Sequence, residues 1–233
     1  MKKQLALLAA GTATAGAIAW RLLSRTEADK KFGTTRTEAD KKFGTKGRKL
    51  VYDAVHALPT HQPYFFKRGE NSPGVPFDIV HKGKTIVKSN NNVHCSGTTF
   101  TSAWVAGNGM GLFDDMTSAQ VKDFQLRWFG ARGDTERQQG PAMEKYGIGG
   151  PISMEDARPG DFVQLWRKSG TGHSVIFLDW VRDEDTGQVI GFKYRSAQGK
   201  GIGTTKEYFS DTPGGAKYGV NRARTYFSRL KSG

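Results

Sequence analysis

The chain has 233 residues, of which 36% are hydrophobic and 11% aromatic, enough for one domain with a buried core and a short tail. Its 30 glycines favour a mixed or strand-rich fold with many turns. The single cysteine excludes an intramolecular disulfide. A formal charge of +13 favours polyanionic partners such as an anionic membrane or a cell envelope. Zinc-finger and helix-turn-helix patterns are missing, so we do not expect nucleic acid as the partner.

The first 24 residues have the pattern of a targeting segment. Two lysines precede an uncharged run from Leu5 to Trp20, and two arginines follow it. The run is shorter than the about 20 residues that a membrane span needs, and Ala17–Ala19 offers a small-x-small cleavage pattern. A cleaved signal peptide and an uncleaved membrane anchor both fit, and the flanking arginines favour the anchor. Either one predicts a domain that is exported or membrane-anchored, on the periplasmic or extracellular side of the envelope.

An internal repeat follows this segment. Residues 25–35 recur as residues 36–46 with ten of eleven positions identical. Two copies are too few for a self-supporting repeat fold, and each copy buries too little to offset its ordering entropy. The repeat therefore predicts a charged spacer over residues 25–46, ahead of one domain over residues 47–233. A basic strip that lies on lipid head groups is the alternative.

Local patterns predict several elements of that domain. Lys49–Leu58 has the spacing of a short helix, which Pro59 ends. A hairpin is predicted around Lys82-Gly83. A later helix is predicted from Thr117 to about residue 129, opened by a capping box with Gln120.

Cys95 is the candidate nucleophile. It follows a polar loop and precedes apolar residues at helical spacing (Phe100, Ala103, Trp104), so it lies at the first turn of a predicted helix. The free N–H groups and the positive dipole end there stabilise a thiolate, and they can also hold the oxyanion of a tetrahedral intermediate. A buried structural cysteine is the alternative.

His173 is the candidate base. It follows a flexible turn and opens the strand pattern Ser174–Leu178, while Phe162–Trp166 predicts a neighbouring strand after an Arg-Pro-Gly-Asp turn. A rigid strand can hold the imidazole in place. His94 adjoins Cys95, but neighbouring residues at a helix start usually point apart. A structural histidine at a strand start is the alternative for His173.

A third group should orient the imidazole by accepting its second ring proton. The next predicted strand, Val189–Gln198, places Gln198 and Ser196 on one face near its end. We favour Gln198, with Ser196 as the alternate. A metal site built from His94, Cys95 and His173 lacks paired ligand spacing, so we expect no metal and no cofactor.

Three motifs in order carry a family resemblance: His-Cys-Ser-Gly at a helix start, then Arg-Pro-Gly-Asp-Phe-Val, then Gly-His-Ser-Val-Ile-Phe-Leu. Over about residues 60–210 the chain resembles the NlpC-like cysteine peptidase superfamily and its CHAP amidase relatives. The resemblance implies an α+β fold, a papain-like half-domain in which a Cys-bearing helix packs on an antiparallel sheet that carries the His. It also implies a substrate-site tyrosine at Tyr64. The chain departs from the family at His94, where Asp is usual, and at Ser174, where Val is common.

The resemblance further implies hydrolysis of peptide or amide bonds in peptidoglycan through an acyl-enzyme on Cys95. Two other functions remain open. An acyltransferase or transglutaminase would use the same Cys-His pair with an amine or alcohol acceptor. A non-catalytic basic module that binds the envelope would use Cys95 only for packing.

Overall fold

The computed structural model describes residues 36–66, 72–215 and 218–232, which form a mixed α+β fold as the sequence predicts. The predicted targeting segment, residues 1–24, and the first copy of the repeat lie outside the described residues. The described helices are α3 (Glu38–Phe43), α4 (Lys46–Ala57), α5 (Cys95–Asn108), α6 (Ser118–Trp128) and α7 (Gln139–Lys145). The strands are β1 (Ile79–His81), β2 (Lys84–Val87), β3 (Gly149–Ile152), β4 (Phe162–Arg167), β5 (Gly172–Arg182), β6 (Val189–Gln198), β7 (Gly201–Tyr208) and β8 (Val220–Leu230).

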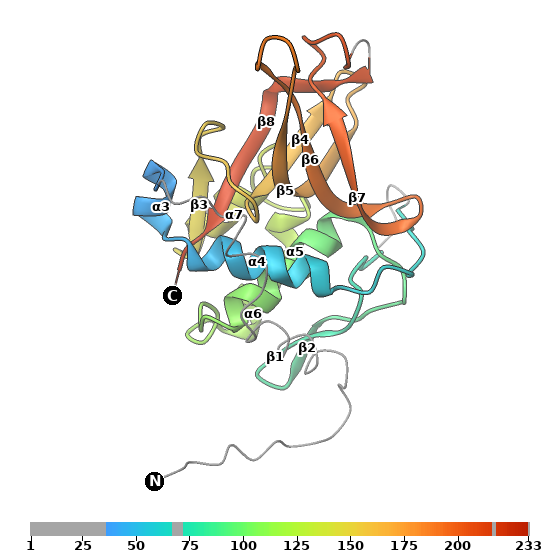
Figure 1. Ribbon diagram of the computed structural model, residues 1–233. Helices are drawn as coiled ribbons and strands as arrows, with labels where there is room; N and C mark the ends of the chain where they lie inside the picture. Colours follow the sequence, from blue (N-terminus) through green and yellow to red (C-terminus); the bar gives the residue numbers. More distant parts are fainter. Residues whose placement is uncertain (1–35, 67–71, 216–217, 233) are drawn as a thin grey trace.

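Six strands form one antiparallel sheet in the order β3-β8-β4-β5-β6-β7. Helices α4, α5 and α6 gather on one side of it, and the β1-β2 hairpin lies beyond them (Figure 1). Apolar side chains pack on both faces of the sheet, as strand β5 shows. Ile176 belongs to the core that the helices cover, whereas its neighbours Val175 and Phe177 belong to a second apolar cluster on the opposite face.

An aromatic cluster fixes helix α5 against the sheet. Trp128 of α6 packs edge-on against Phe162 of β4, with ring centroids 4.9 Å apart, and also contacts Phe100 of α5. Its indole Nε1 donates to Thr99 Oγ1 at 3.0 Å, so the buried polar atom of the ring is satisfied. Because Thr99 and Phe100 lie in the first turns of α5, these contacts hold the end of the helix that carries Cys95.

The local predictions for this region are confirmed. Helix α4 begins three residues before the predicted start and ends at Ala57, just ahead of Pro59. Strands β1 and β2 form the predicted hairpin, whose turn uses positive φ angles at Lys82 (47°) and Gly83 (75°). Helix α6 has the predicted capping box, in which Thr117 N donates to Gln120 Oε1 at 2.7 Å and Gln120 N donates to Thr117 Oγ1 at 3.2 Å.

The prediction of a spacer up to residue 46 is wrong for the second copy of the repeat. Residues of this copy form α3, with Thr37 as its N-cap, and Ala39 and Asp40 are buried. Phe43 is half-buried, and its carbonyl accepts a hydrogen bond from Ser232 N near the end of the chain. One copy in isolation buries too little to offset its ordering entropy, whereas in the protein this copy docks on a site built by the rest of the domain. The folded domain therefore begins ahead of Gly47.

The docking site is a network of buried ion pairs around Arg229 of β8, whose side chain is fully buried. Arg229 Nε and Nη2 each donate to the carboxylate of Asp161 at 2.7 Å, and Nη1 donates to Asp40 Oδ1 at 2.6 Å. Arg48 Nε of α4 donates to the same Asp40 oxygen at 3.0 Å. The network therefore joins α3, α4, β8 and the turn that leads into β4.

The last two residues of the Arg-Pro-Gly-Asp motif, Gly160 and Asp161, are the ones that this ion-pair network requires. Gly160 has a φ angle of 91°, and a Cβ atom there would lie 1.9 Å from the carbonyl oxygen of Arg48. Only glycine allows this approach of the turn to α4. Asp161 follows directly, and its Oδ2 accepts a hydrogen bond from Arg158 N at 2.7 Å while the carboxylate holds Arg229.

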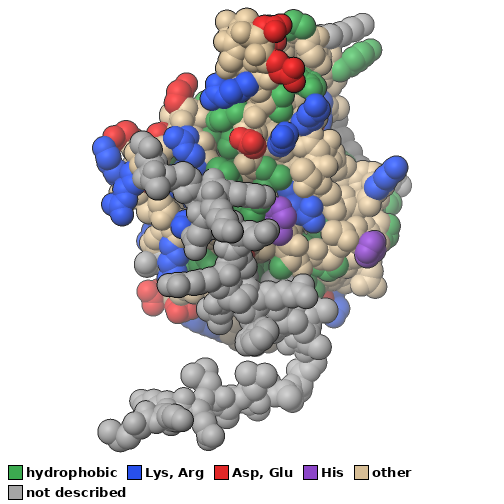
Figure 2. Space-filling view, in the orientation of Figure 1, with side chains coloured by type: hydrophobic (Ala, Val, Ile, Leu, Met, Phe, Trp, Pro, Cys, Tyr) green, Lys and Arg blue, Asp and Glu red, His purple; other side chains and the backbone are tan. Residues whose placement is uncertain are grey.

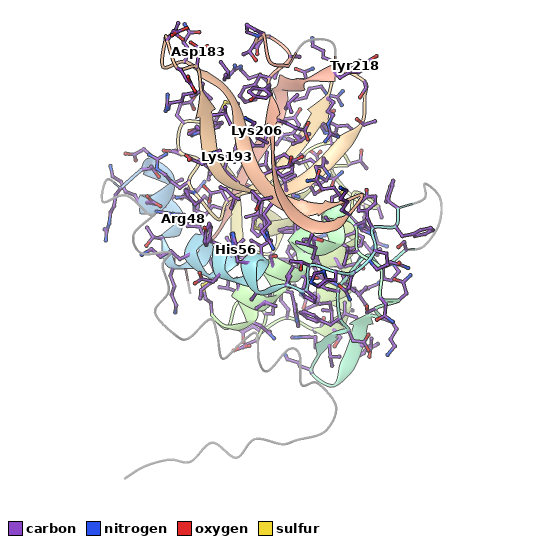
Figure 3. The ribbon with its side chains drawn as sticks, turned by 45° about the vertical axis from the view of Figure 1, so that its right-hand side comes forward. Arg48, His56, Asp183, Lys193, Lys206 and Tyr218 are labelled. Atoms are coloured by element: carbon purple, nitrogen blue, oxygen red, sulfur yellow. The ribbon has the colours of Figure 1, made fainter. Side chains whose placement is uncertain are left out.

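Basic and acidic side chains are interspersed on the face that Figure 2 shows, and Lys and Arg do not gather there into one patch. Lys193 and Lys206 are exposed and lie opposite each other on β6 and β7, where they project from the sheet (Figure 3). None of the described helices is both long and apolar enough to cross a membrane.

We expect Asp161→Ala to destabilise the domain by about 3–5 kcal/mol, because it leaves Arg229 buried with one carboxylate instead of two. Chemical denaturation of the full-length chain measures this loss. Glu155→Ala, an exposed carboxylate in the same loop, is the matched control and should change the free energy of unfolding by less than about 0.5 kcal/mol. Equal effects of the two substitutions would contradict the role given to the network.

Candidate active site

Cys95 is the first residue of α5, as the sequence predicts, and it is partly exposed. The preceding residue, His94, is the N-cap: its Nδ1 atom accepts a hydrogen bond from Gly97 N at 3.1 Å. Its Nε2 atom lies 3.1 Å from the carbonyl oxygen of Ser72, so Nε2 carries the ring proton. His94 therefore takes the capping role that a short acceptor side chain usually has, and both of its ring nitrogens are occupied.

His94 is also held as a neutral group. Burial lowers the pKa of its imidazole, and the hydrogen bond to Ser72 offsets only part of this effect. The ring packs edge-on against Phe129 and Phe66, with centroids 5.2 and 5.8 Å away. A neutral, doubly hydrogen-bonded ring is not placed to act as the base, which argues against His94 as an alternate catalytic residue.

Steric crowding explains why the His-Cys-Ser-Gly motif ends in a glycine, Gly97. A Cβ atom on Gly97 would lie 1.9 Å from the carbonyl oxygen of Gly74, and one on Gly74 would lie 2.0 Å from the ring of His94. The backbone of the Gly74 loop thus lies directly across the first turn of α5. Gly74 also has a φ angle of 57°, and its carbonyl accepts a hydrogen bond from His94 N at 3.1 Å.

A row of hydroxyl and amide groups ties the first turn of α5 to the sheet. Ser96 Oγ lies 3.3 Å from Ser174 Oγ of β5, which donates to Gln164 Oε1 of β4 at 2.6 Å. Ser174 and Gln164 are buried, so these bonds form away from water. Since Cys95 and Ser96 are neighbours, as are His173 and Ser174, this row sets the position of the thiol relative to the imidazole.

His173 is the second residue of β5 and is 7% exposed. It pairs with Leu165 of β4, and its ring packs edge-on against Tyr194 of β6 with the centroids 5.6 Å apart. The charge of the imidazole is close enough to Cys95 to lower the pKa of the thiol. The structure therefore brings together the two residues that the sequence singles out, which are 78 positions apart.

The environment of Cys95 favours the thiolate. Burial raises the pKa of the thiol. A larger lowering comes from the charge and hydrogen bond of His173 and from the hydrogen bonds of Ser174 N–H and Ser96, so the pKa is about 7. The ordinary value is 9.0. Near neutral pH a substantial fraction of Cys95 is thus the nucleophilic form.

Tyr64 lies on the loop beside the nucleophile. It forms an isolated parallel bridge with Val93, two residues before Cys95. Burial and the charge of Cys95 raise the pKa of Tyr64 to about 12, and Arg167 opposes the shift. Its hydroxyl is therefore protonated at neutral pH.

Neither of the residues predicted to orient the imidazole hydrogen-bonds to His173 within the described residues. Ser196 is buried, and its hydroxyl donates to the carbonyl of Ser174 at 2.7 Å. Gln198 ends β6 as predicted, but within the described residues its side chain makes no hydrogen bond. The Nε2 atom of His173 is buried and likewise has no hydrogen-bond partner there. The role of Gln198 therefore stays a prediction.

We did not expect from the sequence that Ser174 bridges Ser96 and Gln164. Nor did we expect the ion pair between Arg167 and Glu207 that lies near the site. Gln164 interrupts the apolar run of β4, where a polar side chain facing inwards needs a partner. Which partner Gln164 has depends on strand order. Glu207 follows the polar residues Thr204–Lys206 of β7, so no such signal marks it.

The arrangement offers an oxyanion site but no metal cluster. Within the described residues, nothing accepts a hydrogen bond from Cys95 N–H at the start of α5. That part of the chain also contains no group of three or more His, Cys, Asp or Glu side chains arranged to hold a metal ion. Cys95 N–H is therefore a donor available to a developing negative charge.

A scan against protein-family models found no match to this chain. Searches of curated proteins and of solved structures likewise found no match. What this site does must therefore be argued from its own geometry.

We expect His94→Asn to retain both the fold and the alkylation profile of Cys95, because the amide oxygen can replace Nδ1 as the acceptor for Gly97 N–H. His94→Ala, which lacks the acceptor, should reduce the free energy of unfolding by about 1–2 kcal/mol. Thermal unfolding and alkylation by iodoacetamide measure the two effects. If the asparagine variant lost the reactivity of Cys95 while remaining folded, His94 would have a chemical role beyond capping.

Proposed function

We propose that the chain is a cysteine hydrolase in which Cys95 is the nucleophile and His173 the base, and that its substrates are peptide or amide bonds, with peptidoglycan as the first class to test. The observation that carries the proposal is the meeting of a helix-start thiol and a strand-start imidazole, with the pKa of the thiol lowered to about 7. A cysteine used only for packing does not need this environment.

The fold around the pair supports the same proposal. A helix that begins at the cysteine packs on an antiparallel sheet, and the histidine opens a central strand of that sheet. This is the arrangement that a papain-like half-domain would have. The three motifs that resemble the NlpC-like and CHAP enzymes all lie in this region, and a peptidoglycan substrate would agree with export directed by residues 1–24.

In the proposed reaction, the Cys95 thiolate attacks the carbonyl carbon of the bound amide. Cys95 N–H and the Tyr64 hydroxyl stabilise the oxyanion that forms. Protonated His173 gives its proton to the leaving amine, the C–N bond breaks, and a thioester with Cys95 remains. Water then attacks the thioester, His173 accepts the proton of that water, and the thiolate leaves as the acid is released. No metal or cofactor takes part.

The pH dependence of Cys95 alkylation tests the pair in the full-length chain. We expect a midpoint near pH 7 in the wild type, and in His173→Ala a rise to about 8.5 or above, because the cationic partner is lost while burial remains. His56→Ala, a histidine exposed on α4 (Figure 3), is the matched control and should leave the midpoint unchanged. Equal midpoints in all three proteins would contradict the proposal.

Product analysis then tests the reaction itself. Purified peptidoglycan fragments should be cleaved by the wild type, and cleavage should fall at least about 1,000-fold in Cys95→Ala. The same products, analysed with an added amine acceptor, distinguish hydrolysis from acyl transfer. Unaltered envelope binding in Cys95→Ala, without cleavage by either protein, would instead favour the non-catalytic basic module.

A further inference from the structure

His173 has an aromatic partner on β6. Its ring packs edge-on against Tyr194, at an interplanar angle of 72°, and within the described residues no group hydrogen-bonds its buried Nε2 atom. In a thiol-imidazole pair a third side chain usually accepts a hydrogen bond from the ring and stabilises its protonated form. Here that stabilisation has to come from something other than a direct hydrogen bond at Nε2.

A carboxylate lies directly behind Tyr194. The Tyr194 hydroxyl donates to Glu207 Oε1 at 2.5 Å. Arg167 binds the same carboxylate in a bidentate ion pair, through Nε at 2.7 Å and Nη2 at 2.5 Å. The side chains of Arg167 and Glu207 are 24% and 20% exposed, so their charges are only partly screened by water. Strands β4, β6 and β7 each supply one member of this cluster.

The charge of Glu207 reaches His173. Burial raises the pKa of Glu207. The hydrogen bonds from Arg167 and Tyr194, together with the charges of Arg167 and His173, lower it by a larger amount. The carboxylate is therefore ionised at neutral pH. Tyr194 thus links the ring of His173 to a negatively charged carboxylate through a ring contact and a hydrogen bond. Cys95 and Tyr64 are the other titratable groups at the site.

We propose that Glu207 is a positioning residue that stabilises protonated His173 through its charge. Tyr194 lies between Glu207 and the ring of His173, and Arg167 holds the Glu207 carboxylate in place. By favouring the imidazolium, Glu207 keeps Cys95 in the thiolate form. This inference rests on the proposed function, because it concerns the same Cys-His pair. It assigns to a residue on β7 the stabilising role that the sequence gave to Gln198 on β6.

A purely structural role of the ion pair makes a different prediction from this electrostatic role. Glu207→Gln removes the negative charge and leaves Arg167, so it disfavours the imidazolium. Arg167→Gln removes the positive charge and leaves Glu207, so it favours the imidazolium. Both substitutions break the same ion pair, but the electrostatic role predicts opposite directions for the reactivity of Cys95.

The test is the pH dependence of iodoacetamide alkylation of Cys95 in the full-length chain. We expect the midpoint to rise by about 1 pH unit in Glu207→Gln, to stay near the wild-type value in Glu207→Asp, and to fall in Arg167→Gln. Glu184→Gln is the matched control: it is exposed in the turn after β5, beside Asp183, which Figure 3 shows at the far end of the sheet from α4. This control should match the wild type.

The outcomes separate the two proposals. If Glu207→Gln matches Glu184→Gln, or if Glu207→Gln and Arg167→Gln raise the midpoint equally, the role of Glu207 is overturned while the Cys-His pair stands. If the wild-type midpoint does not depend on His173 at all, the proposed function itself fails. Thermal unfolding of each variant identifies any that does not fold, and in that case the Glu207→Asp and Arg167→Gln pair decides between the two roles.

Discussion

The buried guanidinium of Arg229 is the contact on which the arrangement of the domain depends. It holds Asp161, where the chain turns into β4, and Asp40, which belongs to α3 and also binds Arg48 of α4. Strand β4 pairs with β5, which carries His173, and α4 packs on α5, which carries Cys95. Both catalytic candidates are therefore positioned by elements that meet at one ion cluster. Such a cluster gains stability only when every charge is paired, so it also specifies which segments come together.

At the site itself, electrostatics outweighs burial. Removing a thiol from water disfavours its ionised form, yet the net effect of His173, Ser174 and Ser96 is a pKa of about 7 instead of 9.0. This difference corresponds to roughly 3 kcal/mol in favour of the thiolate. Tyr194 connects the ring of His173 to Glu207, which is paired with Arg167. In the role proposed for Glu207, its charge acts on the imidazole in addition to the charge of Cys95.

Two differences from the motifs that the chain resembles have local explanations. His94 stands where Asp is usual, and its Nδ1 atom makes the N-cap hydrogen bond that a carboxylate would make. Ser174 stands where Val is common, and its hydroxyl bridges Ser96 of α5 and Gln164 of β4. A neutral cap and a polar bridge place the first turn of α5 on the sheet without adding negative charge beside the thiolate. The departures are thus compatible with the same chemistry.

Local patterns in the sequence determined the helix start at Cys95, the capping box of α6, the strand that His173 opens and the bounds of β6, because these signals depend on residues only a few positions apart. They could not determine the docking of α3, since its two nearly identical copies carry the same signal and the contact of Asp40 with Arg229 spans 189 positions. Nor could they place Glu207 near His173, because strand order decides which inward-facing side chains meet. The candidate nucleophile and base were thus accessible from sequence, whereas the charged groups around them are brought together by tertiary packing.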